Sequence, residues 1–439
     1  MNILVVMFDS LRPDHLGFNG HEYVRTPNID ALAEESAVFG NAIVEFPITI
    51  PSRTALVTGN YTFTNRRWMP LKDDDITLGQ KLQEVGYYNC AFSDTPFSTS
   101  SNMDRGFDEF HWIPGGKCHT PPNPDREVDL SGIHFMPETA PSDVRYYTNS
   151  MKSRAELMQT QGMYFPDIIT REAVKWLEDA AARERKFMLW LDYFDPHEPW
   201  DPPQPYSEMY DPGYRGKFIP MPDMRADHCT KEELRHIVAQ YDGCVTQVDE
   251  QLGKLRACLE GLALWDDTIV VLVSDHGEPF GEHGTIRKFF VPVYDELSKM
   301  VFMIRDPQSA SGGRKIGALV QNTDLMPTLL ARLGIESHET DGIDLNPLIR
   351  GEVDRVRDAA YSGAFQIRGS VRTDEWKLID NRGEKETELF NLPDDPGEKN
   401  NLALQEPELC KKLHRQLWEF GLRWSKVLAW RERPGQMAK

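Results

Sequence analysis

Short continuous apolar runs recur along the chain, and they alternate with segments whose apolar residues repeat every three or four positions. A continuous run predicts a strand buried on both faces, and the longer period predicts an amphipathic helix. The predicted strands are 3–8, 38–46, 87–93, 187–193, 268–273 and 300–304. The predicted helices are 26–35, 51–58, 77–85, 168–184, 231–262 and 323–333. The alternation predicts an α/β fold with a doubly wound, mostly parallel central sheet flanked by helices.

The pattern changes beyond Gly351. Strands at 361–371 and 376–380, followed by an acidic loop and a helix at 407–430, predict a small antiparallel C-terminal subdomain. We therefore expect a catalytic domain over 1–350 and this subdomain over 351–439. Two irregular stretches interrupt the first domain: a loop-rich segment at 97–166, expected to form a wall and lid of the site, and a Pro-rich arm at 198–222.

Composition limits the partners. A net charge of -20 and a pI near 5.1 argue against binding to nucleic acid or to an anionic membrane surface. No apolar run is long enough to span a membrane. The chain begins with a predicted strand, which leaves no room for a signal peptide, and its six cysteines lack CxxC spacing. We expect a cytoplasmic protein, and a homo-oligomer is compatible with these data.

The segment from Thr49 to Gly59 has the composition of an anion site. Pro51 suits the first turn of a helix, and Gly59 suits the position after its end. Thr49 is then expected just outside the helix N-terminus, where unpaired N–H groups attract anions. Arg53, one turn later, adds a forked cationic donor. Taken alone, a Thr-capped surface helix is the simpler interpretation.

Polar residues follow two of the predicted strands. Asp9 ends the first strand, and Asp275 and His276 come directly after the strand at 268–273. Because parallel strands open their carboxyl ends on one edge, these residues are expected to meet there, although exposed turns give the same pattern. A separate zinc cluster is a weaker alternative, with the candidate ligands Cys118, His119, His228 and Cys229.

The stretch from Thr49 to Gly59 resembles the sulfatase signature Cys-x-Pro-Ser-Arg-x-x-x-x-Thr-Gly, a family within the alkaline phosphatase superfamily. The first position alone differs, because Thr49 stands where sulfatases carry the cysteine that becomes formylglycine. The segments 371–378 and 388–396 resemble the C-terminal subdomain of these proteins. The resemblance implies a small anionic ester as substrate and one divalent metal ion, with the ligands Asp9, Thr49, Asp275 and His276.

The resemblance also bears on the metal. Calcium sulfatases typically present Asp-Asp after the first strand and Asp-Asn after the later one, whereas this chain has Ser10 and His276 as the second residues. One hard carboxylate is lost and an imidazole is gained. This exchange favours Zn²⁺ or Mn²⁺, with Ca²⁺ as the alternative.

The implied catalytic residues are Thr49, Arg53, His197, His283 and Lys288. His197 matches a position that touches the ester and its leaving group. His283 and Lys288 match the segment with the family's anion-contacting lysine. A further Lys-x-His contact of sulfatases is missing here, because the chain reads Ser93-Asp94-Thr95 at this place.

The threonine favours one reaction. A sulfated threonine has no second hydroxyl to expel sulfate, whereas a phosphothreonine is hydrolysed by in-line water attack at phosphorus. Thr49 thus resembles the threonine of nucleotide pyrophosphatases and phosphoethanolamine transferases. We predict a metal-dependent hydrolase of phosphoric diesters or phosphonate esters. The alternatives are a sulfatase, an inactive sulfatase homologue that only binds, and a phosphotransferase.

Overall fold

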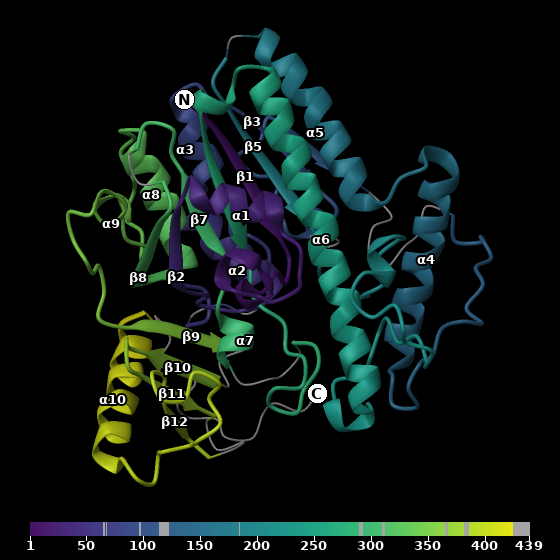
Figure 1. Cartoon of the computed structure of the whole chain (residues 1–439). Coiled ribbons are helices and arrows are strands. Elements are labelled where there is room, and N and C mark those ends of the chain that lie inside the picture. Colours follow the sequence, from purple (N-terminus) through teal and green to yellow (C-terminus); the bar gives the residue numbers. More distant parts are fainter. Residues whose placement is uncertain are drawn as a thin grey trace.

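A central sheet organises the computed structural model, which describes residues 1–64, 66, 68–95, 98–113, 123–183, 185–288, 293–309, 312–364, 368–381 and 386–424. Within these ranges the sheet has eight strands in the order β4-β3-β5-β1-β6-β7-β2-β8 (Figure 1). They are β1 Asn2–Phe8, β2 Ala37–Ile43, β3 Tyr88–Ser93, β4 Glu109–Trp112, β5 Phe187–Tyr193, β6 Thr268–Ser274, β7 Phe302–Arg305 and β8 Arg314–Gln321. Only β7 is antiparallel to its neighbours among these strands. The predicted doubly wound, mostly parallel sheet is confirmed.

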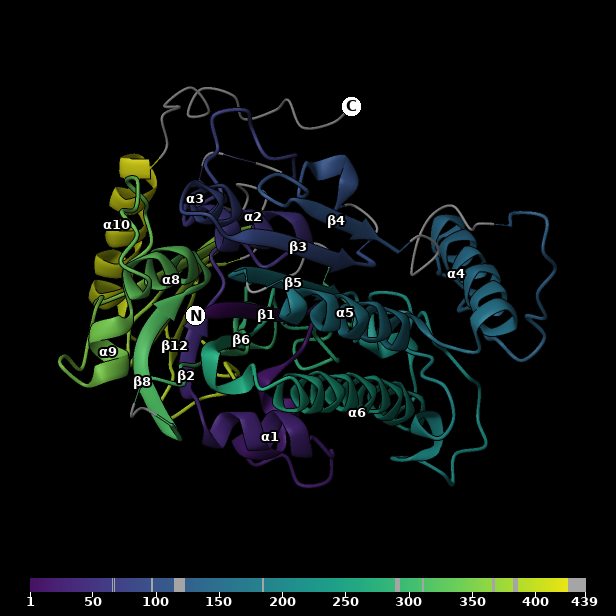
Figure 2. The same cartoon turned by 90° about the horizontal axis from the view of Figure 1, so that it is seen from above.

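Helices cover both faces of this sheet, and Figure 2 shows the resulting layers. Alternate residues of β1 enter the two cores, with Leu4 on one face and Val5 on the other. The Leu4 face packs against α1 (Pro27–Glu34), α5 (Phe165–Ala182) and α6 (Lys231–Gly261). The Val5 face packs against α2 (Thr49–Thr58), α3 (Leu78–Glu84), α8 (Leu325–Arg332) and α9 (Asn346–Arg350). The site therefore rests on a sheet that is buried on both sides.

A second, four-stranded antiparallel sheet forms the C-terminal part (lower left in Figure 1). Its strands are β9 Ala360–Ala364, β10 Arg368–Arg372, β11 Trp376–Asp380 and β12 Glu388–Asn391, and α10 (Pro407–Trp424) packs on it. The single strand predicted at 361–371 is two strands, β9 and β10. Asp295 of α7 (Asp295–Ser298) joins the two parts, because it accepts hydrogen bonds from Arg372 and Lys377.

The loop-rich stretch expected at 97–166 is partly wrong, and several elements were not predicted. The stretch at 97–166 contains β4 and the 21-residue helix α4 (Pro141–Gln161), which lies away from the sheet in Figure 2. Two of the buried positions of α4 are Ser150 and Ser153, so the helix lacks an apolar period. The edge strand β8 was also not expected. Short 3-10 helices complete the described elements at Pro13–His15, Gly17–Asn19, Thr99–Ser101, Tyr206–Glu208, Ala226–His228, Trp265–Asp267 and Asn322–Asp324.

Helix α2 begins two residues earlier than the predicted range 51–58. Ile48 is the extended N-cap residue, so Thr49 is the first residue of the helix and not its outside neighbour. Gly59 ends the helix with a φ of 70°, in the left-handed region where glycine is favoured, as predicted. Thr49 thus lies directly at the helix N-terminus.

Candidate active site

Asp9, Asp275 and His276 meet at the carboxyl edge of β1 and β6. The two strands pair in parallel up to Phe8 and Ser274, which brings the residues that follow them side by side. His276 Nε2 lies 3.8 Å from Asp9 Oδ1 and 3.4 Å from Asp275 Oδ2, and all three side chains are fully buried. The sequence prediction that these residues converge agrees with this geometry.

The three side chains fit a divalent cation. His276 Nδ1 lies 2.8 Å from the carbonyl oxygen of Gly277, so it carries the ring proton and leaves the Nε2 lone pair facing the carboxylates. His276 Nε2 is buried and has no hydrogen-bond partner among the described residues, and Asp9 Oδ2, also buried there without a hydrogen bond, forms an ion pair with Arg53 at 3.1 Å. Burial, reinforced by the charge of Lys288, lowers the pKa of His276 to about 3, which keeps the imidazole neutral as a metal ligand requires.

Arg53 connects these carboxylates to a third one. Its Nη1 donates to Asp275, while Nη2 lies 3.1 Å from Asp9 Oδ2 and 2.7 Å from Asp192 Oδ1. The remaining N–H groups donate to Asp192 Oδ2 through Nε, to Thr95 Oγ1 and to the carbonyl of Thr49. Burial alone would lower the pKa of Arg53, but the three carboxylates raise it well above its ordinary value. All five N–H groups of the guanidinium therefore have partners within the protein.

Helix α2 is fixed to the end of β6 by its serine. Ser52 Oγ donates to the carbonyl of Asp275 at 2.6 Å and accepts from Asn322 Nδ2 at 3.2 Å. Asn322 Oδ1 in turn accepts from the amide of Glu45, just before the helix. Thr49, which is 3% exposed, is thus held near Asp275 through the backbone of its own helix.

Lys288 and His197 form a second group at the site. Lys288 Nζ donates to Ser10 Oγ at 3.1 Å and lies 4.0 Å from Asp9 Oδ1. Two buried carboxylates complete its surroundings, with Glu278 Oε2 at 3.3 Å and Glu198 Oε2 at 3.7 Å. His197 Nδ1 lies 2.6 Å from the carbonyl of Glu198, and its ring stacks on Phe194. Burial lowers the pKa of His197 to about 3, which favours the neutral ring.

The structure does not bring His283 into this group. Its Nδ1 lies 2.6 Å from Glu296 Oε1, and its Nε2 lies 2.9 Å from the carbonyl of Glu398. The ring stacks on Tyr294 at 3.6 Å between centroids. Both ring nitrogens are therefore engaged at the boundary with the C-terminal sheet.

Three acidic residues of the site escape the sequence analysis. Asp192 is the only charged residue in the otherwise apolar run of β5, and this is a signal that was available. Glu198 and Glu278 follow the predicted residues His197 and His276 by one and two positions. Burial, together with the charge of Glu198, raises the pKa of Glu278 to about 8. The site consequently contains more acidic groups than the sequence alone suggested.

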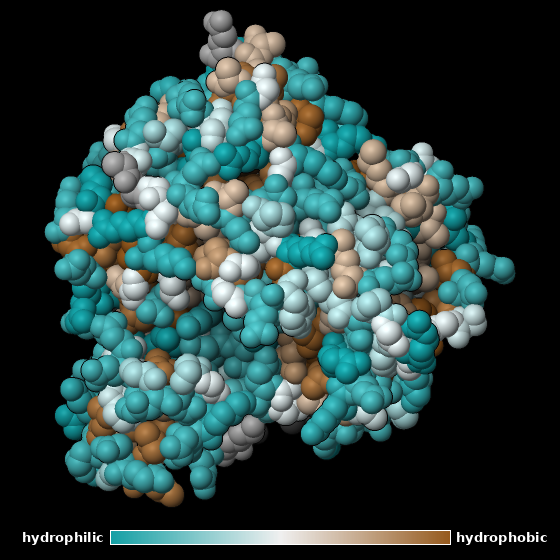
Figure 3. All heavy atoms as spheres, viewed as in Figure 1, coloured by the Kyte–Doolittle hydropathy of each residue, from teal (hydrophilic) through white to brown (hydrophobic). Residues whose placement is uncertain are grey.

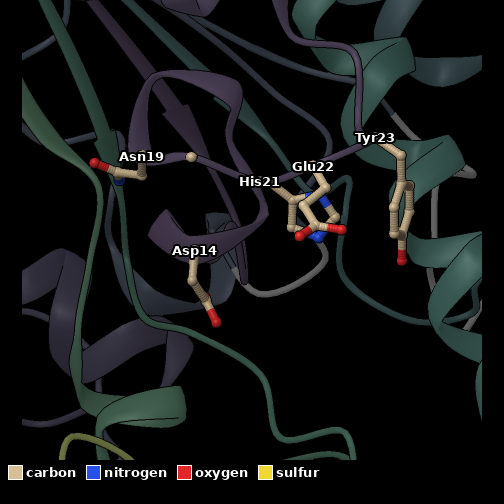
Figure 4. A pocket seen from close by; sticks show the side chains of 6 residues that line it. Asp14, Asn19, His21, Glu22 and Tyr23 are labelled. Atoms are coloured by element: carbon tan, nitrogen blue, oxygen red, sulfur yellow. The ribbon is translucent and has the colours of Figure 1, made fainter.

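Other candidates do not join the site. Cys118 and His119 of the alternative zinc cluster lie outside the described residues, while His228 Nδ1 lies 2.5 Å from Asp223 Oδ2. A pocket of about 320 Å³ is lined by Asp14, Asn19, Gly20, His21, Glu22 and Tyr23 (Figure 4). It contains none of the predicted catalytic residues.

Comparison with known proteins decides the family. Residues 1–335 match the family model described as Sulfatase. The chain belongs to the sulfatase family. Residues 281–422 also match the model of the N-sulphoglucosamine sulphohydrolase C-terminal region. Members of this family are metal-dependent hydrolases of ester bonds, and alkaline phosphatase superfamily proteins are among the relatives.

Sulfatases and related hydrolases align over most of the chain. The uncharacterized sulfatase YidJ of Escherichia coli is 26% identical over 448 residues, which cover 95% of this chain and 86% of the relative. An arylsulfatase of Clostridium perfringens is 26% identical over 92% of this chain and 90% of its own length. The multifunctional alkaline phosphatase superfamily protein PehA of Trinickia caryophylli is 26% identical over 79% and 77%.

Solved structures agree on the fold. The phosphonate monoester hydrolase of Agrobacterium radiobacter superposes with a TM-score of 0.74 at 22% identity, over 97% of this chain and 96% of that one.

In the described part of the chain no helix is long and apolar enough to cross a membrane. The face in Figure 3 is mostly hydrophilic with scattered hydrophobic residues.

Proposed function

We propose that this sulfatase-family protein hydrolyses phosphoric diesters or phosphonate esters through a covalent intermediate on Thr49. The observation that carries the proposal is the position of Thr49 at the start of α2, with its carbonyl and the carboxylates of Asp9 and Asp275 held by one guanidinium. A hydroxyl at this place takes the role that formylglycine has in sulfatases. PehA and the phosphonate monoester hydrolase support phosphorus chemistry on this fold.

Asp9, Asp275, His276 and the Thr49 hydroxyl would hold the divalent ion, for which we favour Zn²⁺ or Mn²⁺ over Ca²⁺. When bound, such an ion lowers the pKa of a coordinated hydroxyl and withdraws charge from the ester. Arg53 keeps the two carboxylates and α2 in register. The reactive group is thereby oriented before the substrate arrives.

The nature of the nucleophile favours phosphorus over sulfur. As Thr49 Oγ1 attacks the phosphorus atom in line with the leaving oxygen, its hydroxyl proton passes to solvent, and His197, protonated beforehand from solvent, gives a proton to the leaving oxygen. Water then attacks the phosphorus of the phosphothreonine, which releases the phosphorus acid and returns a proton to Thr49 Oγ1. His197 must first take up a proton, because its pKa is low in the free protein. A sulfothreonine would require water attack at sulfur, because threonine lacks the second hydroxyl of hydrated formylglycine.

The charges of the site favour a monoanionic ester. The cations Arg53, Lys288 and Arg287 face a larger set of buried carboxylates, namely those of Asp9, Asp192, Asp275 and Glu198, while Glu278, with its pKa raised to about 8, is mostly protonated at neutral pH. A divalent cation would bring the balance only close to neutrality. A dianionic monoester would meet more repulsion here than a diester or a phosphonate monoester, each with a single charge.

A sulfatase is the second candidate, because family membership and two of the four named relatives favour sulfuric esters. A phosphotransferase uses the same phosphothreonine but passes it to an alcohol. Initial rates on matched nitrophenyl esters, comprising a phosphodiester, a phosphonate, a phosphate monoester and a sulfate, separate the candidates. Faster turnover of the sulfate than of every phosphorus ester would overturn the proposal.

The nucleophile is tested by substitution. Thr49→Ala should lower turnover by orders of magnitude while Asp9, Asp275 and His276 still bind metal, and Thr49→Ser should retain part of the activity. Rapid quenching with a labelled diester should yield a phosphorylated peptide that contains Thr49. Wild-type turnover by Thr49→Ala would instead identify water as the nucleophile.

A further inference from the structure

The carboxylate of Glu198 lies between the two donor side chains of the second group. Its Oε2 is 3.1 Å from His197 Nδ1 and 3.7 Å from Lys288 Nζ. Its Oε1 accepts from Arg287 Nε at 3.0 Å, and the side chain is 3% exposed. One buried carboxylate thus sets the relative position of an imidazole, an ammonium and a guanidinium.

Arg287 extends this contact to helix α4. Its Nη1 donates to Asp143 Oδ2 at 2.7 Å, in the first turn of α4, and to the carbonyl of Pro222 at 3.1 Å. The residue has a φ of 68°, which is uncommon outside glycine, and its side chain is 5% exposed. The backbone next to Lys288 is therefore held in a conformation that its own side-chain contacts stabilise.

We propose that Glu198 and Arg287 are positioning residues, which orient His197 and Lys288 toward the ester and couple both to helix α4. The role in catalysis rests on the proposed function, whereas the mechanical coupling does not. The carbonyl of Glu198 accepts from His197 Nδ1, so Nε2 is the nitrogen at which the ring would take up and deliver a proton. The Glu198 carboxylate lies on the same side of the ring and stabilises the protonated imidazole. His197 must reach this form before it can donate a proton.

A second ion pair provides the matched control. Arg154 of α4 donates to Asp201 Oδ1 at 2.7 Å, and the two side chains are 12% and 7% exposed. This pair also anchors α4 to the arm, three residues beyond Glu198, but through a different carboxylate. If a variant acted only by loosening the attachment of α4, substitutions in either ion pair should therefore have the same effect on turnover.

The kinetic test compares leaving groups on whichever ester the wild type hydrolyses. Glu198→Gln should lower kcat for both esters, and the loss for an alkyl ester should exceed the loss for the matched nitrophenyl ester by at least about tenfold. The reason is that only the alkoxide leaving group needs a proton. Asp143→Asn should act in the same direction but less strongly. Arg154→Lys should affect both esters equally. Equal losses for both esters in Glu198→Gln, matching Arg154→Lys, would overturn the positioning role.

The coupling is measured without substrate by hydrogen exchange. Asp143→Asn should speed exchange in segment 194–200 as well as in 141–150, because it frees Arg287 from α4. Arg154→Lys should leave 194–200 unchanged. Unaltered exchange at 194–200 in Asp143→Asn would overturn the coupling. If the wild type hydrolysed no ester tried, the proposed function would fail while this measurement still decided the coupling.

Discussion

The guanidinium of Arg53 lies 3.1 Å from the carboxylate of Asp9, although the two residues belong to α2 and to the end of β1. The same side chain contacts Asp192 and Asp275, so its positive charge reduces the repulsion among the three carboxylates. In sulfatase signatures an arginine at this place invites the interpretation of a substrate donor. The occupied N–H groups of Arg53 support a role in holding the carboxylates in place, beside the catalytic role that the resemblance implies.

Removing this cation should destabilise the protein strongly. In metal-free protein, Arg53→Ala removes the counter-charge that three buried carboxylates share and leaves Lys288, 4.0 Å from Asp9, to compensate in part, which should cost about 3–5 kcal/mol in the free energy of unfolding. Arg53→Lys keeps the charge but loses the fork, so it should cost less. Urea denaturation measures both values. Equal stability of Arg53→Ala and the wild type would contradict the role assigned to the cluster.

One divalent ion per chain is expected in the wild-type protein, most simply measured by elemental analysis after dialysis. Asp275→Ala should lose it, because a ligand disappears. Asp192→Asn is the matched control, since Asp192 also contacts Arg53 but is not among the proposed ligands. Full occupancy in Asp275→Ala would show that the ion binds elsewhere.

His197→Ala should impair esters with poor leaving groups far more than nitrophenyl esters. The reason is that nitrophenolate departs without a proton, whereas an alkoxide needs one. Steady-state kinetics on the two series give the ratio. A uniform loss would mean that His197 only places the substrate.

His283 should affect stability rather than turnover. Both of its ring nitrogens face acceptors, and although burial opposes it, the carboxylate of Glu296 raises the pKa of His283. Because the folded-state pKa is raised, this stabilisation is full below the unfolded value of about 6.5 and is lost as pH rises through the folded value.

The measurement is urea unfolding at a series of pH values from 6 to 9, with His283→Gln as the control. The variant should lose about 1 kcal/mol at the acidic end and approach the wild type at the alkaline end. Its kcat should stay close to that of the wild type. A large loss of kcat would restore the catalytic role that the sequence implied.

Much of the fold was predictable because its signals are local. The runs of β1 and β6 are almost entirely apolar and that of β5 is interrupted only by Asp192, so the sequence predicts the sheet. Polar residues follow β1 and β6, which predicts that Asp9 and Asp275 meet. Helix α4 was not predictable in this way. Its inner face uses Ser150 and Ser153, which contact neighbours without an apolar pattern.

The sequence predicts which residue types belong to the site, but it does not predict which side chains pair with one another. A sequence shows that Arg53 is a cation, but it does not show that three carboxylates from distant strands saturate it. His283 illustrates the same limit, since its neighbours Glu296 and Glu398 come together only in the folded chain. Pairings across long sequence separations depend on tertiary contacts.

The central place of β1 has a consequence for synthesis on the ribosome. Ile3 pairs with Met188 on one side and with Ile269 on the other. The first strand to be synthesised therefore stays unpaired until β5 and β6 have left the ribosome. Contacts of such long range slow folding and leave an apolar strand unpaired in the nascent chain. Asp275 and His276 follow the last of these partners, so only a nearly completed sheet can acquire the ion.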